Sequence, residues 1–110
     1  MEPTTFASDR PAPKLAEALS MLRAYEPELR LAGVLHASIF GSVARAEAVA
    51  GSDLDILVEL DPSAHVSMFE LMGIELRLRE MFQMKVDVVS KRGLRPLLDD
   101  SILADAVEAF

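Results

Sequence analysis

Two aspartates stand at the start of a short apolar segment, and this feature limits what the chain can fold into. Residues 54–60 are mostly aliphatic and are closed by Asp61 and Pro62, a pattern typical of a buried β-strand. Asp53 and Asp55 are two positions apart, so on a strand their side chains emerge on the same face. Adjacent carboxylates repel each other unless a cation lies between them. The segment therefore predicts a strand that holds a divalent ion such as Mg²⁺.

Two further apolar segments predict strands, and one of them carries a third aspartate. They cover residues 34–40 and 85–90, and Asp87 lies among valines in the second. If that strand lies beside the Asp-x-Asp strand, Asp87 joins Asp53 and Asp55 on one face. Such a cluster can hold two metal ions, one on a triphosphate and one that activates an attacking hydroxyl. Asp87 would then help to take the proton of that hydroxyl.

A glycine–serine pair at the end of the first predicted strand supplies the other half of this site. Gly41 lets the backbone approach a phosphate, and Ser42 adds a hydroxyl at the start of a helix expected over residues 43–49. Arg45 can neutralise phosphate charge. Taken singly, the pair is an ordinary capped turn and Arg45 a solvated side chain. Their spacing relative to the three aspartates favours a nucleotide and metal site.

The remaining segments predict helices. Apolar residues recur at helical spacing from Lys14, and Pro27 is expected to end or kink that helix. Ser67 can cap a long helix that runs to Phe82, and apolar residues over 102–110 predict a closing helix. The expected order is helix, strand, strand, helix, strand, helix.

The long predicted helix has an apolar surface wider than a surface helix needs. One stripe is expected to pack on the sheet, and Phe69, Met72 and Leu76 form a second line at helical spacing. The favoured interpretation buries this second line between the sheet and the C-terminal helix. The alternative is a face on which a partner docks, rich in adaptable methionine.

Length and charge limit the number of domains and the kinds of partner that this chain can have. The chain has 110 residues, enough for one domain, predicted over 14–110, after a proline-containing flexible arm over 1–13. Its formal net charge of -7 argues against non-specific binding of nucleic acid, which needs clustered Lys and Arg. The acidic surface either suits a basic protein partner or only keeps the domain soluble. No signal peptide or membrane anchor is recognised, so a cytoplasmic location is expected, and the absence of cysteine excludes thiolate metal sites.

These residues resemble a known active-site pattern. The Gly41-Ser42 pair, Asp53-Leu54-Asp55 and Asp87 together look like the motif of the DNA polymerase beta-like nucleotidyltransferase superfamily. The short length resembles its minimal members, the MNT antitoxins usually encoded beside HEPN-domain toxins. The resemblance runs from about the first helix to the C-terminus. Ala46 departs from the pattern, because relatives commonly carry glycine after the Ala-Arg pair.

The resemblance implies an α/β (α+β) fold in which a small mixed sheet is flanked by helices. It further implies Mg²⁺ at Asp53, Asp55 and Asp87, and an ATP triphosphate at Gly41 and Ser42. Relatives of this type transfer AMP from ATP to a hydroxyl, typically of a tyrosine, on a HEPN ribonuclease toxin and so neutralise it. A homo-oligomer or a hetero-oligomer with the toxin would be compatible with this role.

Two other functions stay open at the level of sequence. The protein could neutralise its partner by stoichiometric binding without catalysis, as the acidic surface and the broad apolar helix would allow. A transferase for small molecules such as antibiotics is a further alternative. Enzymes of that kind usually need an extra domain to form the acceptor pocket, and a chain of this length leaves no room for one unless a dimer supplies it.

Overall fold

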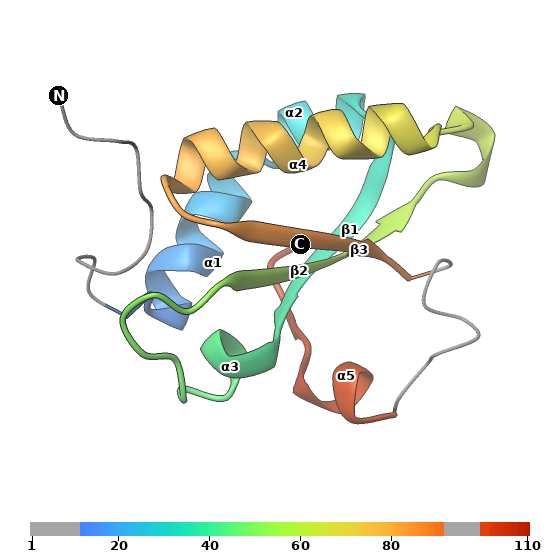
Figure 1. The fold of residues 1–110 in the computed structure, drawn as a ribbon. Coiled ribbons are helices and arrows are strands. Elements are labelled where there is room, and N and C mark those ends of the chain that lie inside the picture. The colour runs from blue at the N-terminus through green and yellow to red at the C-terminus, as the bar shows by residue number, and fades with distance from the viewer. Residues whose placement is uncertain (1–11, 92–99) are drawn as a thin grey trace, which may run out of the picture.

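The computed structural model describes residues 12–91 and 100–110, so the predicted arm over 1–13 lies almost wholly outside the described residues. A four-stranded sheet carries α1, α2 and α4 on one side and α3 and α5 on the other (Figure 1). The elements in chain order are α1 (Leu15–Ala24), α2 (Glu26–Leu31), β1 (Val34–Phe40), α3 (Gly41–Ala44), β2 (Leu54–Leu60), the 3₁₀ turn η1 (Pro62–Ala64), α4 (Met68–Phe82), β3 (Val86–Ser90), α5 (Asp100–Asp105) and β4 (Val107–Glu108).

The sheet is mixed, as predicted, with strand order β3-β2-β1-β4. β1 pairs antiparallel with both β2 and β4, whereas β2 and β3 run parallel. A parallel pair needs a long crossover, and α4 provides it between β2 and β3. β2 and β3 therefore begin at the same edge of the sheet, and this brings the aspartates at the start of each strand together.

The core lies between the sheet and the layer of α1, α2 and α4. Along β2, Leu54, Ile56 and Val58 are fully buried, and they belong to one apolar cluster with Ile74 and Leu78 of α4. The strand alternates, so the residues between them face the opposite side of the sheet. This alternation explains how one strand contributes both to the core and to a polar site.

Residues 14–32 form two helices, and a proline begins the second. α1 ends at Ala24, and Pro27 lies in the first turn of α2. Proline is tolerated there because the first helical N–H groups have no partner within the helix. The expected break at Pro27 is confirmed, and the residues that follow it form a separate helix.

The predicted start of α4 is confirmed in detail. The Ser67 side chain accepts a hydrogen bond from the Glu70 backbone N–H at 3.1 Å, and Glu70 accepts one in return from the Ser67 N–H at 3.3 Å. This reciprocal capping box satisfies two donors that a helix start leaves without partners. The helix ends at Phe82, as the sequence indicates.

The predicted burial of the second apolar line on α4 is wrong. Phe69, Met72 and Leu76 are 85%, 53% and 58% exposed. Met68, in the first turn of α4, is also exposed. The physical reason is the position of α5, which lies on the opposite side of the sheet from α4 and so leaves this surface uncovered (Figure 1).

The predicted closing helix is only partly correct. α5 ends at Asp105, and Val107–Glu108 forms β4 beside β1. The Ala109 N–H donates to Ala37 O at 2.8 Å, and the Arg30 guanidinium lies 5.1 Å from the centre of the Phe110 ring. Without β4, the backbone N–H and C=O groups along this edge of β1 would lack partners. Pairing with β4 satisfies them, whereas a longer helix would not.

Gly73 provides a test of the packing on α4. A Cβ atom built at this helical glycine meets nothing within 4 Å. Alanine has a higher helix propensity than glycine by about 0.8–1 kcal/mol. We therefore expect Gly73→Ala to raise the free energy of unfolding by roughly that amount in urea titrations followed by circular dichroism. A loss of stability would show that this surface of α4 is more crowded than the structure indicates.

Candidate active site

Three aspartates gather where β2 and β3 begin. Asp55 and Asp87 are register partners in the parallel pair, so their side chains are neighbours on the same face of the sheet. Asp53 lies one residue before β2 and shares that face by alternation. The structure thus confirms the predicted juxtaposition of the three residues, on the side of the sheet opposite α4.

The three carboxylates act on one another electrostatically. Burial raises the pKa of Asp55 most, and the charges of Asp87 and Asp53 raise it further. The nearby cations of Arg45 and Lys85 act in the opposite direction. Asp55 is therefore a partly desolvated acid beside two like charges, an arrangement that a bound cation would stabilise.

Gly41 brings the backbone directly against the Asp55 carboxylate. Its φ of +75° is one that L side chains rarely adopt, and a Cβ atom at this position would collide with Asp55 Oδ2. Only glycine satisfies both conditions. Ser42 follows as the second residue of α3, partly exposed, and no side chain caps this helix at its start.

The predicted helix over 43–49 is much shorter than expected, because α3 ends at Ala44. Ala46 takes a φ of +59°, its N–H donates to Val43 O, and the Glu47 N–H donates to Ser42 O at 2.8 Å. These two bonds form a Schellman motif, in which the residue at this left-handed position is usually glycine. Ala46, at which this chain departs from the motif of the superfamily, therefore lies at a position where glycine would be the least strained residue.

We expect Ala46→Gly to stabilise the protein. The left-handed conformation costs an alanine about 1–2 kcal/mol, and the greater chain entropy of glycine offsets part of the gain. A net increase of about 0.5–1 kcal/mol in the free energy of unfolding should appear in urea titrations. Ala44→Gly, within α3, is the matched control and should destabilise. If both changes destabilise, Ala46 does not hold this conformation in solution.

Arg45 lies beside the site but is bound to other side chains. Its Nε donates to Glu47 Oε1 and its Nη1 to Asp105 Oδ2, both at 2.8 Å. These contacts raise the pKa of Arg45, so it remains a cation. They connect the end of α3 to α5, a contact between distant segments that no local sequence pattern indicates.

Lys85 is a site residue that sequence reasoning did not assign. Its Nζ lies 3.5 Å from Asp53 Oδ2. Lys85 directly precedes β3, which begins at Val86 and not at Lys85 as predicted. The sequence signal that indicates Lys85 as a site residue is its position two residues before Asp87, because this spacing places the two side chains on one face of a strand.

The carboxylates fit a divalent ion by their chemistry. Oxygen donors from two or three aspartates suit Mg²⁺ completed by water and phosphate oxygens. Burial, and then the charges of Asp87 and Asp53, raise the pKa of Asp55, and a bound cation would act in the opposite direction. As the side chains stand, residues 12–91 and 100–110 contain no group of three or more potential ligands converging on one point. Asp53 pairs instead with Lys85.

The sequence matches the family described as nucleotidyltransferase domain over residues 22–108, and the chain belongs to this family. Among relatives, a candidate protein adenylyltransferase of Methanocaldococcus jannaschii is 43% identical over 84 residues, which cover 76% of this chain and 88% of that protein. The protein adenylyltransferase MntA of Thermococcus cleftensis is 34% identical over 94 residues, covering 84% and 93%.

Solved structures agree with this assignment. A candidate minimal nucleotidyltransferase superposes with a TM-score of 0.69 at 35% identity, covering 83% of this chain and 92% of that one. A crystal structure of a toxin–antitoxin with AMP-PNP superposes with a TM-score of 0.64, covering 86% of this chain and 71% of that one. At 18% identity this second likeness supports the fold alone. The chain is thus a minimal nucleotidyltransferase in fold and family.

The electrostatics of Asp55 lead to a prediction for the metal-free protein. Folding raises the pKa of Asp55, so the protonated carboxyl contributes to the stability of the folded protein. This contribution is complete below the pKa of Asp55 in the unfolded chain and is lost as pH rises through its pKa in the folded protein. The Asp55→Asn side chain cannot ionise, so the variant should keep this stability at neutral pH. In EDTA at neutral pH the variant should melt at a higher temperature than wild type, and the difference should vanish in acid. Equal melting at neutral pH would contradict this.

Proposed function

We propose that this protein is a Mg²⁺-dependent protein adenylyltransferase that transfers AMP from ATP to a hydroxyl, most simply a tyrosine, of a HEPN-domain toxin and so neutralises it. The protein would act as the antitoxin of that pair. A cytoplasmic location, where ATP is available, belongs to the same proposal. Within the described residues, none of the helices is long and apolar enough to cross a membrane.

The register of the parallel strands carries this proposal. Asp55 and Asp87 are partners across β2 and β3, and Gly41 lies against the Asp55 carboxylate on the side of β1. One face of the sheet therefore carries three carboxylates beside the Gly41 turn, where we infer that phosphate binds. This is the arrangement that a reaction at a nucleoside triphosphate requires.

Each residue has a proposed task. The backbone at Gly41 and the hydroxyl of Ser42 would hold the β- and γ-phosphates, with Arg45 adding positive charge. Asp87 would orient the attacking hydroxyl and accept its proton. Asp53 and Asp55 would hold Mg²⁺, which supplies charge neutralisation at the phosphates when bound.

The names of the relatives support a protein acceptor. Two of them are described as protein adenylyltransferases, and each aligns over most of its length with this chain. Two structures with the same fold are described as toxin–antitoxin structures, and one of them contains AMP-PNP, an ATP analogue. ATP as nucleotide and a toxin as partner follow for this chain by analogy.

The position of the label in ATP tests the reaction type. The protein is incubated with Mg²⁺, a HEPN-domain toxin proposed as its partner, and ATP labelled on either the α- or the γ-phosphate. Transfer of AMP predicts toxin labelling from the α-phosphate only, with release of pyrophosphate. Labelling from the γ-phosphate would instead indicate a kinase, and an EDTA control tests the need for a metal ion.

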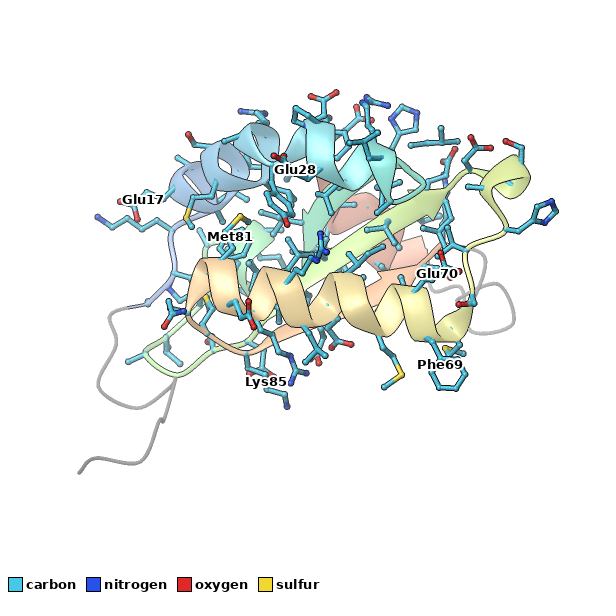
Figure 2. All side chains as sticks on the ribbon, turned by 90° about the horizontal axis from the view of Figure 1, so that it is seen from above. Glu17, Glu28, Phe69, Glu70, Met81 and Lys85 are labelled. Carbon is cyan, nitrogen blue, oxygen red and sulfur yellow. The ribbon has the colours of Figure 1, made fainter. Side chains whose placement is uncertain are left out.

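A binding antitoxin without catalysis is the second candidate. The observation that favours it is the exposed apolar line Phe69, Met72 and Leu76 on α4, which could cover a partner surface. In Figure 2, Phe69 projects away from the body of the protein. If a variant lacking both Asp53 and Asp55 carboxylates neutralises the toxin in cells as well as wild type does, this second function is the correct one.

A further inference from the structure

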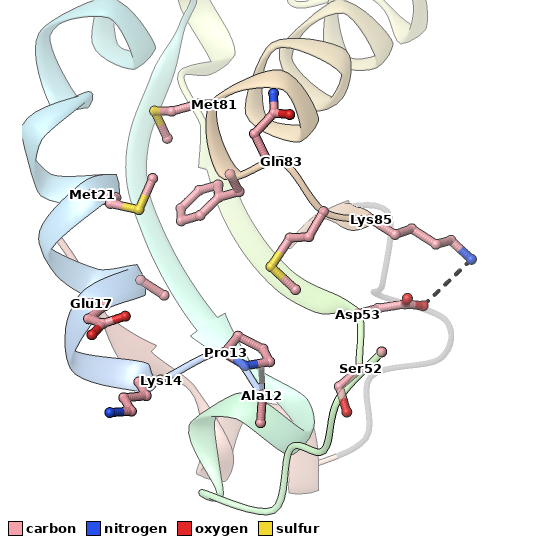
Figure 3. A pocket seen from close by; sticks show the side chains of 14 residues that line it. Ala12, Pro13, Lys14, Glu17, Met21, Ser52, Asp53, Met81, Gln83 and Lys85 are labelled. Atoms are coloured by element: carbon pink, nitrogen blue, oxygen red, sulfur yellow. Dashed lines mark ion pairs between the residues drawn. The ribbon is translucent and has the colours of Figure 1, made fainter. Parts of the chain in front are cut away.

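The aspartate cluster of Asp53, Asp55 and Asp87 makes a single ion pair within residues 12–91 and 100–110. Asp53 Oδ2 lies 3.5 Å from the Nζ of Lys85, and Figure 3 shows the two side chains directed toward each other. Among the residues that the structure describes, no three potential ligands converge on one point. The carboxylate of Asp53 is thus oriented by a lysine, and not by a point that all three aspartates share.

The backbone holds Lys85 at this place. The Leu54 N–H donates to Lys85 O at 3.0 Å, directly before the register pair of Leu54 with Val86. Val86 is fully buried in the core, so by alternation Lys85 lies on the opposite face of the sheet, which carries the aspartates. Continuing the parallel register by one residue places Lys85 beside Asp53. The register that assembles the aspartates therefore also brings a lysine to them.

Lys85 is the counter-ion of the cluster in the metal-free protein. Two cations, Arg45 and Lys85, lower the pKa of Asp55. Arg45 forms ion pairs with Glu47 and Asp105, so carboxylates outside the cluster already neutralise it. Lys85 pairs with the cluster itself. One ammonium offsets only one of three negative charges, and this leaves the site short of positive charge.

The pair of Lys85 with Asp53 can break at little cost. The two side chains are 55% and 38% exposed, and ion pairs that reach solvent contribute little to stability. A divalent ion carries twice the charge of an ammonium and takes several oxygen ligands at once. Asp53 must turn away from Lys85 if its carboxylate is to converge with those of the other two aspartates. Lysine and metal ion therefore compete for the same carboxylate.

We propose that Lys85 is a tethered competitor of the metal ion: its ammonium holds Asp53 in the metal-free protein and is released when a divalent ion binds. The inference rests on the proposed function, because it takes the aspartates as ligands of Mg²⁺. It assigns Lys85 as a positioning residue that sets how tightly the free protein binds the metal. Because this competition weakens the site, the ion binds best together with a triphosphate, whose oxygens add further ligands.

Mn²⁺ binding in the absence of nucleotide tests this competition. Free Mn²⁺ is measured by electron paramagnetic resonance, so the readout does not depend on catalysis. Lys85→Met removes the competing charge and should tighten Mn²⁺ binding about tenfold. Lys85→Arg keeps the charge, but a guanidinium pairs more strongly with a carboxylate than an ammonium does. In that variant Mn²⁺ binding should weaken about threefold.

Lys91 provides the matched control. It carries the same charge and pairs with Glu59 at 3.5 Å. Glu59 lies on the face of the aspartates, four residues after Asp55. This separation is about 13 Å along the strand and exceeds the Debye length of about 8 Å at physiological ionic strength. Lys91→Met should therefore leave Mn²⁺ binding unchanged. Equal tightening by Lys85→Met and Lys91→Met would reduce the effect to net charge and overturn the inference.

Thermal melting gives a second readout. In EDTA, Lys85→Met leaves three carboxylates without their counter-ion, so the variant should melt at a lower temperature than wild type. At saturating Mn²⁺ the difference should disappear, because tighter binding to the folded state stabilises the variant more. A difference that persists at saturating Mn²⁺ would show that Lys85 stays in place when the ion binds, against the inference.

The remaining outcomes separate this inference from the proposed function. If Lys85→Met binds Mn²⁺ no better than wild type, or if neither protein binds it at millimolar concentration, the inference fails. Label transfer from ATP at saturating Mg²⁺ is then measured with the same proteins. Transfer by wild type without the expected changes in Mn²⁺ affinity leaves the proposed function standing and removes the role of Lys85. The expected affinities without any transfer do the reverse.

Discussion

Replacing Asp53 and Asp55 together by alanine is expected to reduce AMP transfer to the toxin by about 10³-fold or more. The change removes two of the three carboxylates of the aspartate cluster, and with them the proposed donors for a divalent ion. Metal-ion stabilisation of charge contributes several kcal/mol, and each 1.36 kcal/mol is a factor of ten in rate. The measurement is the initial rate of label transfer from the α-phosphate of ATP.

Glu59 offers a matched control for this variant. It lies on β2 four residues after Asp55 and so on the same face, but it pairs with Lys91 at 3.5 Å, away from the cluster. Glu59→Gln should retain the wild-type rate. Circular dichroism of each variant confirms folding. Label transfer that persists in the double alanine variant would falsify the assignment of the aspartate cluster as the reaction centre.

Gly41→Ala is expected to damage both folding and activity. The left-handed conformation at Gly41 costs an L-residue about 1–2 kcal/mol. The new methyl group would also collide with the Asp55 carboxylate, which must then move. A displacement of about 1 Å in a reacting group can cost about 10²-fold in rate. Denaturant titration measures the first effect, and the rate of transfer at saturating ATP measures the second.

A second glycine separates these two effects. Gly33 also has a left-handed φ, of +101°, in the turn before β1. Gly33→Ala should therefore also lose stability through backbone strain, but its methyl group would meet Val66 and Ala64 and not Asp55. If both variants lose activity equally, strain alone explains the loss and the close approach of Gly41 to Asp55 has no catalytic role.

Local sequence patterns were sufficient for most of the fold. The strands at residues 34–40 and 54–60 and the capped helix to Phe82 were predicted with the bounds that the structure has. Each has a signal within its own residues: an apolar run closed by turn residues, or a capping serine followed by helical periodicity. The helix predicted over residues 43–49 is too long, because Ala46 takes a conformation for which glycine is the usual signal.

Segments whose environment depends on distant residues were predicted poorly. Val107–Glu108 has helical periodicity with the residues before it, but pairing with β1 makes it a strand. Phe69, Met72 and Leu76 read as core residues, yet α5 lies on the other side of the sheet and leaves them exposed. In both cases tertiary contacts override a local preference.

The sequence by itself determined which residues can do chemistry. Alternation along a strand puts Asp53 and Asp55 on one face. Glycine is the residue that allows a positive φ and a close approach of the backbone to another group, and Gly41 does both. The tertiary structure decided which residues meet. The parallel register of β2 and β3 brings Asp87 beside Asp55 and Lys85 beside Asp53. Register joins segments far apart in the chain, and no local pattern encodes it.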